Sequence, residues 1–328
     1  MIDKRKIIFR ADGGHHIGMG HFIRTLALAE MLKGHFQCVY ATQTPSQYQI
    51  HEIERVCQNV IELPSNKSHF SAFLDQLQGD EIVVLDNYYF TTDYQRAIKQ
   101  KGCKLVCIDD LHDRYFVSDL VINHAPGISI NDYSTDENTK LLLGLEYVLL
   151  RRSFLEKAMC RKEKVKRDTV FINFGGEDRL NISLKVLYDM VKTKPDLKAK
   201  IVVGHSNHHL DSIKEFISKS SNEIQLFVNR SASEMAEIMW NCDFAVVPCS
   251  TVLFEAVACK LPFITGAYVE NQKLIASYFN NQTDGIVLQN IIEDSIPWDN
   301  LINLYETSTN DLIDGKSKNR LIENFKGL

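Results

Sequence analysis

The chain has 328 residues, of which 45% are hydrophobic and 24% are charged, and its formal net charge is −5. This length exceeds what one hydrophobic core usually supports, so we expect two domains. The slightly acidic balance argues against a nucleic-acid-binding protein, which would carry an excess of Lys and Arg on one face. No apolar run approaches the ~18 residues of a membrane-spanning helix, so no membrane span is expected.

The eight cysteines predict reduced thiols rather than disulfides or a metal site. No signal peptide precedes the first apolar run, and Cys38, Cys107 and Cys259 lie inside apolar patterns, where a thiol acts as a small hydrophobic side chain. Cys103 and Cys107 are separated by three residues, so they do not form a Cys-x-x-Cys motif. We therefore expect a cytoplasmic protein.

In the first half of the chain, short apolar runs alternate with segments of helical periodicity. The expected strands are residues 6–10, 37–41, 81–86, 104–108 and 120–122, and the expected helices are residues 21–33, 47–57, 68–77 and 92–101. This alternation predicts an α/β domain with a parallel sheet and helices on both faces.

The second half repeats the pattern. The expected strands are residues 169–174, 200–203, 224–227, 244–247 and 263–265, and the expected helices are residues 183–192, 210–219, 233–241, 251–259 and 271–280. Residues 161–167 are almost wholly charged and suit an exposed linker, so we place the boundary near residue 165, between domains 1–164 and 165–328. Residues 308–328 contain an expected final helix, which in proteins of this shape can cross back to the first domain.

A glycine-rich loop, residues 13–20, follows the first expected strand and leads into the first expected helix. Ligands of open α/β sheets bind at this end of the strands, and glycines let the backbone approach them closely. No glycine stands at position 23, and no Gly-Lys-Ser/Thr follows, so neither the dinucleotide nor the ATP-binding fingerprint is present. We expect no cofactor.

His21, at the start of that helix, is the leading catalytic candidate. The helix N-terminus favours a neutral imidazole, which can accept a proton from water. The alternative is that His21 only caps the helix. His15 and His16 are adjacent loop residues that can simply be solvated, and no acidic or cysteine ligand stands beside them at helical spacing, so we expect no metal site.

The motifs Arg10-Ala11-Asp12, Ile17-Gly18-x-Gly20-His21-x-x-Arg24 and Leu26-Ala27-Leu28-Ala29 resemble the start of a known enzyme family. This family is the UDP-2,4-diacetamido-2,4,6-trideoxy-β-L-altropyranose hydrolases of pseudaminic acid biosynthesis. It is related to spore-coat polysaccharide biosynthesis proteins and, more remotely, to the N-acetylglucosamine transferase of peptidoglycan synthesis. Further motifs extend the resemblance over roughly residues 6–280. It implies two Rossmann-like domains in a B-type glycosyltransferase (GT-B) arrangement, with the active site in an interdomain cleft.

The resemblance places the catalytic histidine on His21. Asp12 is a candidate to orient the ligand or the histidine, although an aspartate there can also cap backbone amides in a turn. Tyr88 is expected to line the sugar pocket, its alternative being an ordinary aromatic residue of the core or surface. The other expected substrate-binding residues of the first domain are Gly18, Gly20, Arg24 and Asn87.

The second domain offers a UDP site. Glycines after its first strand would admit a diphosphate, and the residues that open a later helix would supply free amides to phosphate, although they can also serve as ordinary caps. A glutamate one turn further suits the ribose diol, and two amide side chains suit sugar hydroxyl and acetamido groups. These candidates are, in chain order, Gly175, Gly176, Asp178, Ser250, Thr251, Glu255, Asn271 and Gln272.

The reaction implied is hydrolysis of the bond between UDP and a 2,4-diacetamido-2,4,6-trideoxy hexose, with inversion at the anomeric carbon. No Asp-x-Asp motif is present to hold a divalent ion on the diphosphate, so we expect a metal-independent enzyme. The alternatives are a UDP-sugar-dependent GT-B glycosyltransferase and a non-catalytic nucleotide-sugar-binding protein. The UDP-sugar is the expected partner. A monomer is compatible with the sequence, which leaves the oligomeric state and the sugar stereoisomer open.

Overall fold

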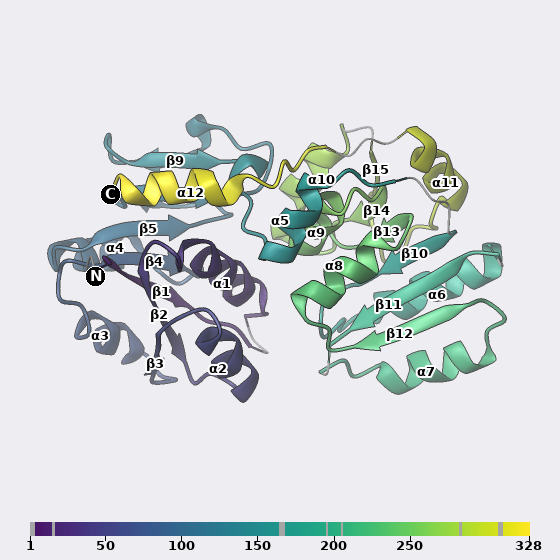
Figure 1. Ribbon diagram of the computed structural model, residues 1–328, viewed down its shortest axis with the longest axis horizontal. Coiled ribbons are helices and arrows are strands. Elements are labelled where there is room, and N and C mark those ends of the chain that lie inside the picture. The colour runs from purple at the N-terminus through teal and green to yellow at the C-terminus, as the bar shows by residue number, and fades with distance from the viewer. Residues whose placement is uncertain are drawn as a thin grey trace. The chain divides into compact units, whose positions relative to one another are not determined.

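The computed structural model describes residues 4–14, 17–163, 168–194, 196–204, 206–281, 284–307 and 311–328. It divides into two compact units, of which unit 1 comprises Met1–Arg152 and Lys316–Leu328 and unit 2 comprises Ser153–Gly315 (Figure 1). The boundary expected near residue 165 falls on residues 164–167, outside the described residues.

Unit 1 contains a seven-stranded parallel sheet in the order β3-β2-β1-β4-β5-β7-β9. Its strands are β1 (Lys6–Ala11), β2 (Gln37–Gln43), β3 (Asn59–Leu63), β4 (Ile82–Asp86), β5 (Lys104–Ile108), β7 (Leu120–Asn123) and β9 (Lys140–Leu143). Its helices are α1 (Gly20–Leu32), α2 (Gln47–Glu54), α3 (His69–Leu74), α4 (Thr92–Gln100) and α12 (Ser317–Lys326), with short 3₁₀ helices η1 (Ile130–Asp132) and η2 (Leu145–Tyr147) and a small pair of strands β6 (Tyr115–Phe116) and β8 (Ser134–Thr135).

The central strands of unit 1 are continuous apolar runs because both faces of the sheet are covered. All five residues of β4 are buried, as are five of the six in β1. Such runs are typical of parallel strands in a doubly wound sheet. The final helix, α12, packs on α1, and its Phe325 ring lies 6.3 Å from that of Phe36. Residues 316–328 thus complete the core of unit 1.

Unit 2 contains a six-stranded parallel sheet in the order β12-β11-β10-β13-β14-β15. Its strands are β10 (Thr169–Ile172), β11 (Lys198–Val203), β12 (Ile224–Val228), β13 (Phe244–Val246), β14 (Phe263–Gly266) and β15 (Gly285–Leu288). Its helices are α5 (Arg152–Met159), α6 (Ile182–Thr193), α7 (Leu210–Lys219), α8 (Ala232–Trp240), α9 (Thr251–Ala258), α10 (Lys273–Phe279) and α11 (Trp298–Thr307), with the 3₁₀ helix η3 (Glu270–Gln272).

In both sheets the first strand is internal, with the second and third strands on one side and the later strands on the other. The strand order therefore reverses between β1 and β4 in unit 1, and between β10 and β13 in unit 2. In doubly wound folds the carboxyl ends of strands at such a reversal form the ligand-binding edge. The predicted α/β class with two Rossmann-like domains is confirmed.

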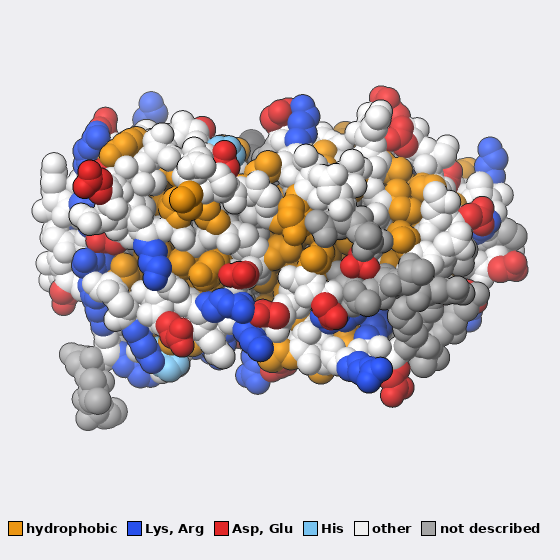
Figure 2. All heavy atoms as spheres, turned by 90° about the horizontal axis from the view of Figure 1, so that it is seen from above, with side chains coloured by type: hydrophobic (Ala, Val, Ile, Leu, Met, Phe, Trp, Pro, Cys, Tyr) orange, Lys and Arg blue, Asp and Glu red, His pale blue; other side chains and the backbone are white. Residues whose placement is uncertain are grey.

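The distribution of charge on the surface and the length of the helices both bear on the class of protein. Figure 2 shows basic and acidic side chains interspersed over the face in view, as the small net charge of the chain leads one to expect. Among the described helices, none combines the length and the apolar character needed to cross a membrane.

Candidate active site

The glycine-rich loop is folded back on itself before α1 begins. Gly14 and Gly18 form an antiparallel bridge, with the Gly18 amide donating to the Gly14 carbonyl at 2.7 Å. Gly18 has a φ of 81°, a conformation that favours glycine. A Cβ atom on Gly13 would lie 2.7 Å from the Cβ atom of Phe22, so the turn packs closely on α1, which begins at Gly20. His15 and His16 lie outside the described residues.

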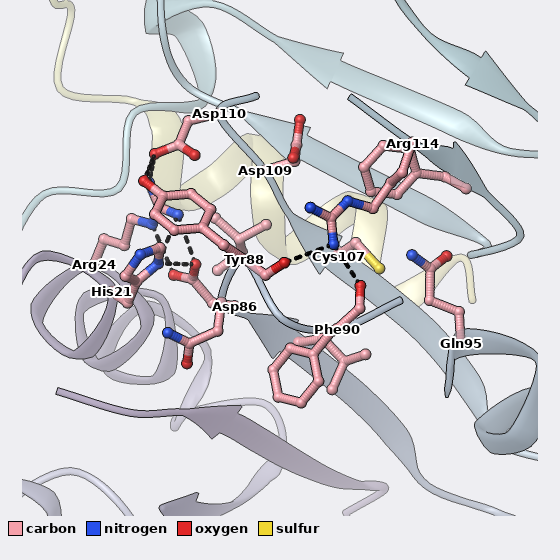
Figure 3. Close-up of a pocket in the computed structure, with 14 residues that line it drawn as sticks. His21, Arg24, Asp86, Tyr88, Phe90, Gln95, Cys107, Asp109, Asp110 and Arg114 are labelled. Atoms are coloured by element: carbon pink, nitrogen blue, oxygen red, sulfur yellow. Dashed lines mark hydrogen bonds and ion pairs between the residues drawn. The ribbon is translucent and has the colours of Figure 1, made fainter. Parts of the chain in front are cut away.

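His21 is the second residue of α1 and is 6% exposed. Its Nδ1 lies 2.7 Å from Oδ1 of Asp86, the last residue of β4 (Figure 3). Because β4 is adjacent to β1, this contact forms where the strand order of the sheet reverses. A carboxylate at Nδ1 selects the tautomer with the proton on Nδ1, which leaves Nε2 as the acceptor. The cap of α1 is Met19, so His21 does not serve as the helix cap.

Asp86 is fully buried and is held as an anion by several donors. Arg24 donates from Nε to Oδ2 at 2.7 Å and from Nη2 to Oδ1 at 2.6 Å, and the Thr25 hydroxyl donates to Oδ2 at 2.8 Å. Burial alone would raise the pKa of Asp86, but the charges and hydrogen bonds of Arg24 and His21 hold it well below its usual range. The histidine therefore faces a permanent negative charge.

Arg24, expected from sequence to bind substrate, is directed into the protein. Its Nη1 donates to Oδ2 of Asp110 at 2.9 Å, so each guanidinium nitrogen lies beside a protein group. The residue is buried, with the Asp86 carboxylate on one side and Asp110 on the other. This geometry fits a positioning role better than direct contact with a ligand.

Tyr88 stands at the surface of the site, with 40% of the residue exposed. Its ring meets that of His21 edge to face at a centroid distance of 4.6 Å, and its hydroxyl donates to Oδ2 of Asp110 at 3.1 Å. Arg114 supports this segment by donating to the carbonyls of Tyr88 and Phe90 at 2.9 and 2.7 Å (Figure 3). These residues, with His21 and Asp86, line a pocket of about 20 Å³, room for one or two water molecules.

Asp12 does not contact His21. Its carboxylate forms a bidentate pair with Arg10 at 2.6 and 2.9 Å, and it accepts hydrogen bonds from Thr42, from Gln43 and from the Tyr89 hydroxyl. Burial would raise the pKa of Asp12, but these donors hold it well below its usual range. The expectation that Asp12 orients the histidine is therefore corrected, because Asp86 occupies that place.

Asn87, another expected substrate-binding residue, is buried and lines the same pocket as Tyr88. Its Oδ1 accepts the backbone N–H of Asp12 at 2.9 Å and the Tyr89 hydroxyl at 3.1 Å. Asn87 thus joins the loop after β4 to the loop after β1. The expected residues of unit 1 gather at one edge of the sheet, but in two hydrogen-bonded groups, one around Asp86 and one around Asp12.

In unit 2, glycine is required at two places, Gly175 in the loop after β10 and Gly204 directly after β11. Gly175 has a φ of 85°, and the Gly176 carbonyl accepts the Gly204 amide at 2.9 Å. A Cβ atom on Gly204 would lie only 2.6 Å from that carbonyl oxygen. Asp178, further along the loop, is buried and accepts the backbone N–H groups of Ile182 and Ser183, each at 2.9 Å. The N-terminus of α6 is therefore already satisfied by a carboxylate and disfavours a phosphate.

The N-terminus of α9 differs. Its cap is Ser250, whose own side chain forms no cap hydrogen bond. Thr251 opens the helix, and Glu255 lies one turn later with 3% exposure. Because α9 follows β13, which pairs with β10, its first amides lie at the carboxyl edge of the sheet where the strand order reverses. A phosphate fits such a helix start.

The two amide candidates follow β14, the next strand along the sheet. The Oε1 atom of Gln272 accepts the Tyr268 backbone N–H at 3.1 Å, and Gln272 is buried. Asn271 lies in η3, and its side chain is outside the described residues. In the part of the chain that the structure describes, no group of three or more His, Cys, Asp or Glu side chains is placed to hold a metal ion.

Two doubly wound sheets with polar residues at their carboxyl edges define a two-domain Rossmann-like protein. Comparison with protein-family models gives no match. The sequence is 27% identical over 277 residues to the UDP-2,4-diacetamido-2,4,6-trideoxy-beta-L-altropyranose hydrolase of Campylobacter jejuni, covering 83% of this chain and 95% of that protein. It is 26% identical over 300 residues to the spore coat polysaccharide biosynthesis protein SpsG of Bacillus subtilis, covering 89% and 85%.

Solved structures confirm the fold. MurG of Acinetobacter baumannii superposes with a TM-score of 0.67 at 10% identity, over 99% of this chain and 100% of that one. HepE of Anabaena, solved with UDP and glucose, gives a TM-score of 0.61 at 12% identity, over 99% and 100%. The predicted GT-B class is confirmed, and so is the resemblance of this chain to the UDP-diacetamido-sugar hydrolase and to the spore-coat protein.

Proposed function

We propose that this chain hydrolyses a UDP-2,4-diacetamido-2,4,6-trideoxy hexose to UDP and the free sugar, as a step of pseudaminic acid biosynthesis. The observation that carries the proposal is the contact of 2.7 Å between His21 Nδ1 and Asp86 Oδ1, because in the neutral ring it directs the proton to Nδ1 and leaves Nε2 as the acceptor. The similarity to the Campylobacter jejuni hydrolase supports the choice of substrate.

In the proposed reaction, His21 Nε2 removes a proton from water while the water oxygen bonds to the anomeric carbon. The bond from that carbon to the UDP oxygen breaks, and its electron pair leaves with UDP. Asp86 stabilises the imidazolium that forms. Attack from the face opposite UDP inverts the anomeric centre. In this proposal Tyr88, whose ring lies against His21, contacts the sugar.

We assign UDP to unit 2, with the diphosphate at the N-terminus of α9 and the ribose at Glu255. The start of α9, where the Ser250 side chain forms no cap hydrogen bond, supports this assignment, whereas Asp178 already satisfies the start of α6. Backbone amides there would stabilise the negative charge that develops on the leaving group. In this proposal they do the work that a divalent cation does in other nucleotide-sugar enzymes, and the reaction needs no metal.

The test is to incubate the chain with a panel of UDP-2,4-diacetamido sugars and follow UDP release by ³¹P NMR and the released anomer by ¹H NMR. Turnover without an acceptor and with inversion is expected. UDP release that requires an added acceptor would instead support a glycosyltransferase. Binding of UDP with no turnover of any sugar in the panel would support a non-catalytic binding protein.

The decisive variant is His21→Asn. The asparagine amide nitrogen takes the place of Nδ1 and can still donate to Asp86, but nothing replaces Nε2. We expect kcat to fall about 10²- to 10⁴-fold with unchanged UDP affinity. His35→Asn, at an exposed histidine of the same unit, is the matched control and should retain wild-type turnover. A folded His21→Asn variant with near wild-type turnover would remove His21 from the mechanism.

A further inference from the structure

The contact between His21 and Asp86 affects the protonation of the His21 ring as well as its tautomer. A buried carboxylate against an imidazole favours the protonated, cationic ring, and a cationic histidine cannot act as a base. Asp86 is fully buried, and Asp110 adds a second carboxylate nearby. For His21 to act as a base, another group in the site must counteract the negative charges that favour protonation of its ring.

Arg24 has the geometry to do so. Its guanidinium pairs with both oxygens of Asp86, and Nη2 lies 3.0 Å from His21 Nδ1. The Nδ1 proton is directed to Asp86, so this second contact is between two donors and forms no hydrogen bond. A positive charge at that distance disfavours a second positive charge on the ring.

Arg114 is the other cation that lines the pocket, and it donates to the Tyr88 and Phe90 carbonyls. Burial raises the pKa of Tyr40 well above its usual range, so this residue of β2 stays neutral. Burial lowers the pKa of His124, which follows β7, to about 3, so it is neutral as well. Asp110 is an acid that accepts hydrogen bonds from the Tyr88 hydroxyl and from Arg24. Arg24 is the cation that contacts both His21 and Asp86.

We propose that Arg24 is a positioning residue that keeps His21 unprotonated, by neutralising Asp86 and by placing its own charge beside the imidazole. The inference rests on the proposed function only in that His21 is the base of the reaction. Without the guanidinium, the charge of Asp86 would face the ring unopposed, and His21 would hold its proton to a higher pH. The free Nε2 that the mechanism needs would then be lost near neutrality.

The test is a direct NMR titration of His21 in the full chain labelled with ¹³C and ¹⁵N at histidine, with the His21→Asn variant used to assign its signals. We compare wild type with Arg24→Gln, which removes the charge, and with Arg24→Lys, which keeps it. In Arg24→Gln the titration midpoint should rise by about one pH unit or more, a tenfold gain in proton affinity. In Arg24→Lys it should stay closer to that of wild type.

A second variant tests the same idea if Arg24→Gln does not fold. Asp110→Asn removes the carboxylate that partly offsets Arg24, at a side chain that is 18% exposed. Here the midpoint should move down, opposite to the shift in Arg24→Gln. A purely structural role for Arg24 would lower the melting temperature without moving the titration. Unchanged midpoints in both Asp110→Asn and the folded Arg24 variants would overturn the proposal.

This readout needs no turnover, so it separates the inference from the proposed function. If no UDP-sugar is hydrolysed but the midpoints move as expected, the role of Arg24 stands and the proposed reaction fails. If hydrolysis is observed and the midpoints do not move, the reaction stands and the role of Arg24 fails. If both hold, the acid limb of the pH-rate profile should shift with the NMR midpoint, and Arg24→Gln should regain activity at alkaline pH.

Discussion

His124 should make unit 1 sensitive to acid. It follows β7, is 5% exposed, and its Nδ1 accepts the backbone N–H of Leu149 at 3.0 Å. Burial lowers its pKa to about 3, far below the ordinary value. The folded chain therefore keeps this ring neutral under conditions in which the unfolded chain protonates it.

The sign and size of the effect follow from proton linkage. Because the folded pKa of His124 is the lower one, its contribution to stability is complete above the unfolded pKa of about 6.5 and is lost as the pH falls toward the folded value. Between about pH 7.5 and about pH 4.5, this single group should reduce the free energy of unfolding by about 3 kcal/mol.

The perturbation is His124→Asn, whose Oδ1 can still accept the Leu149 N–H but does not titrate. Urea unfolding of wild type and variant should be followed at several pH values by circular dichroism. Both tryptophans, Trp240 and Trp298, lie in unit 2, so their fluorescence reports that unit alone. The variant should lose less stability than wild type between pH 7.5 and 4.5, by about 3 kcal/mol.

His35→Asn is the control for this experiment, because His35 is exposed and its replacement leaves the buried ring of His124 untouched. The variant His124→Asn can be less stable than wild type at every pH. The quantity compared is how much the free energy of unfolding of each protein changes with pH. If wild type and His124→Asn lose stability in parallel as the pH falls, the reasoning about the buried ring is refuted.

Three further outcomes are expected in unit 2 and in the reaction. Gly204→Ala should lower the free energy of unfolding of unit 2 by about 1–3 kcal/mol, measured by tryptophan fluorescence in urea, because its Cβ would lie 2.6 Å from the Gly176 carbonyl oxygen. Glu255→Ala should weaken UDP binding by about 1–3 kcal/mol in calorimetry, and an unchanged affinity would remove Glu255 from the ribose site. Turnover should survive EDTA, and a loss that magnesium or manganese restores would contradict a metal-free mechanism.

Much of the fold could be predicted because the central strands are recognisable in the sequence as short apolar runs. Buried parallel strands such as β4 and β5 are short runs of Val, Ile and Leu, and the expected ranges match these elements within a residue. The missed strand β15 has that signature, since it reads Gly-Ile-Val-Leu, but two other missed strands lack it. β3 is a half-exposed edge strand, and β9 reads Lys-Leu-Leu-Leu, a composition that suits a helix as well as a strand.

The candidate site could be predicted only where the signal is local. The glycine-rich loop marks His21, but the acid that holds it stands 65 residues later, at the end of β4. Pairing the two requires knowing that β4 lies beside β1, which is a property of strand order and not of either segment. A carboxylate that ends an apolar strand, as Asp86 does, is the signal to look for. Asp12 was the nearer acid in sequence, but Arg10 and Tyr89 take up its carboxylate.

The return of α12 to unit 1 has a consequence for how the chain is made. Unit 1 is assembled from two stretches separated by all of unit 2, Met1–Arg152 and Lys316–Leu328. A ribosome therefore synthesises the whole of unit 2 before the helix that covers Phe36 and contacts α1. Until that helix is made, unit 1 keeps an apolar face of α1 open to solvent or to a chaperone. The unit that is encoded first is thus the one that the last residues complete.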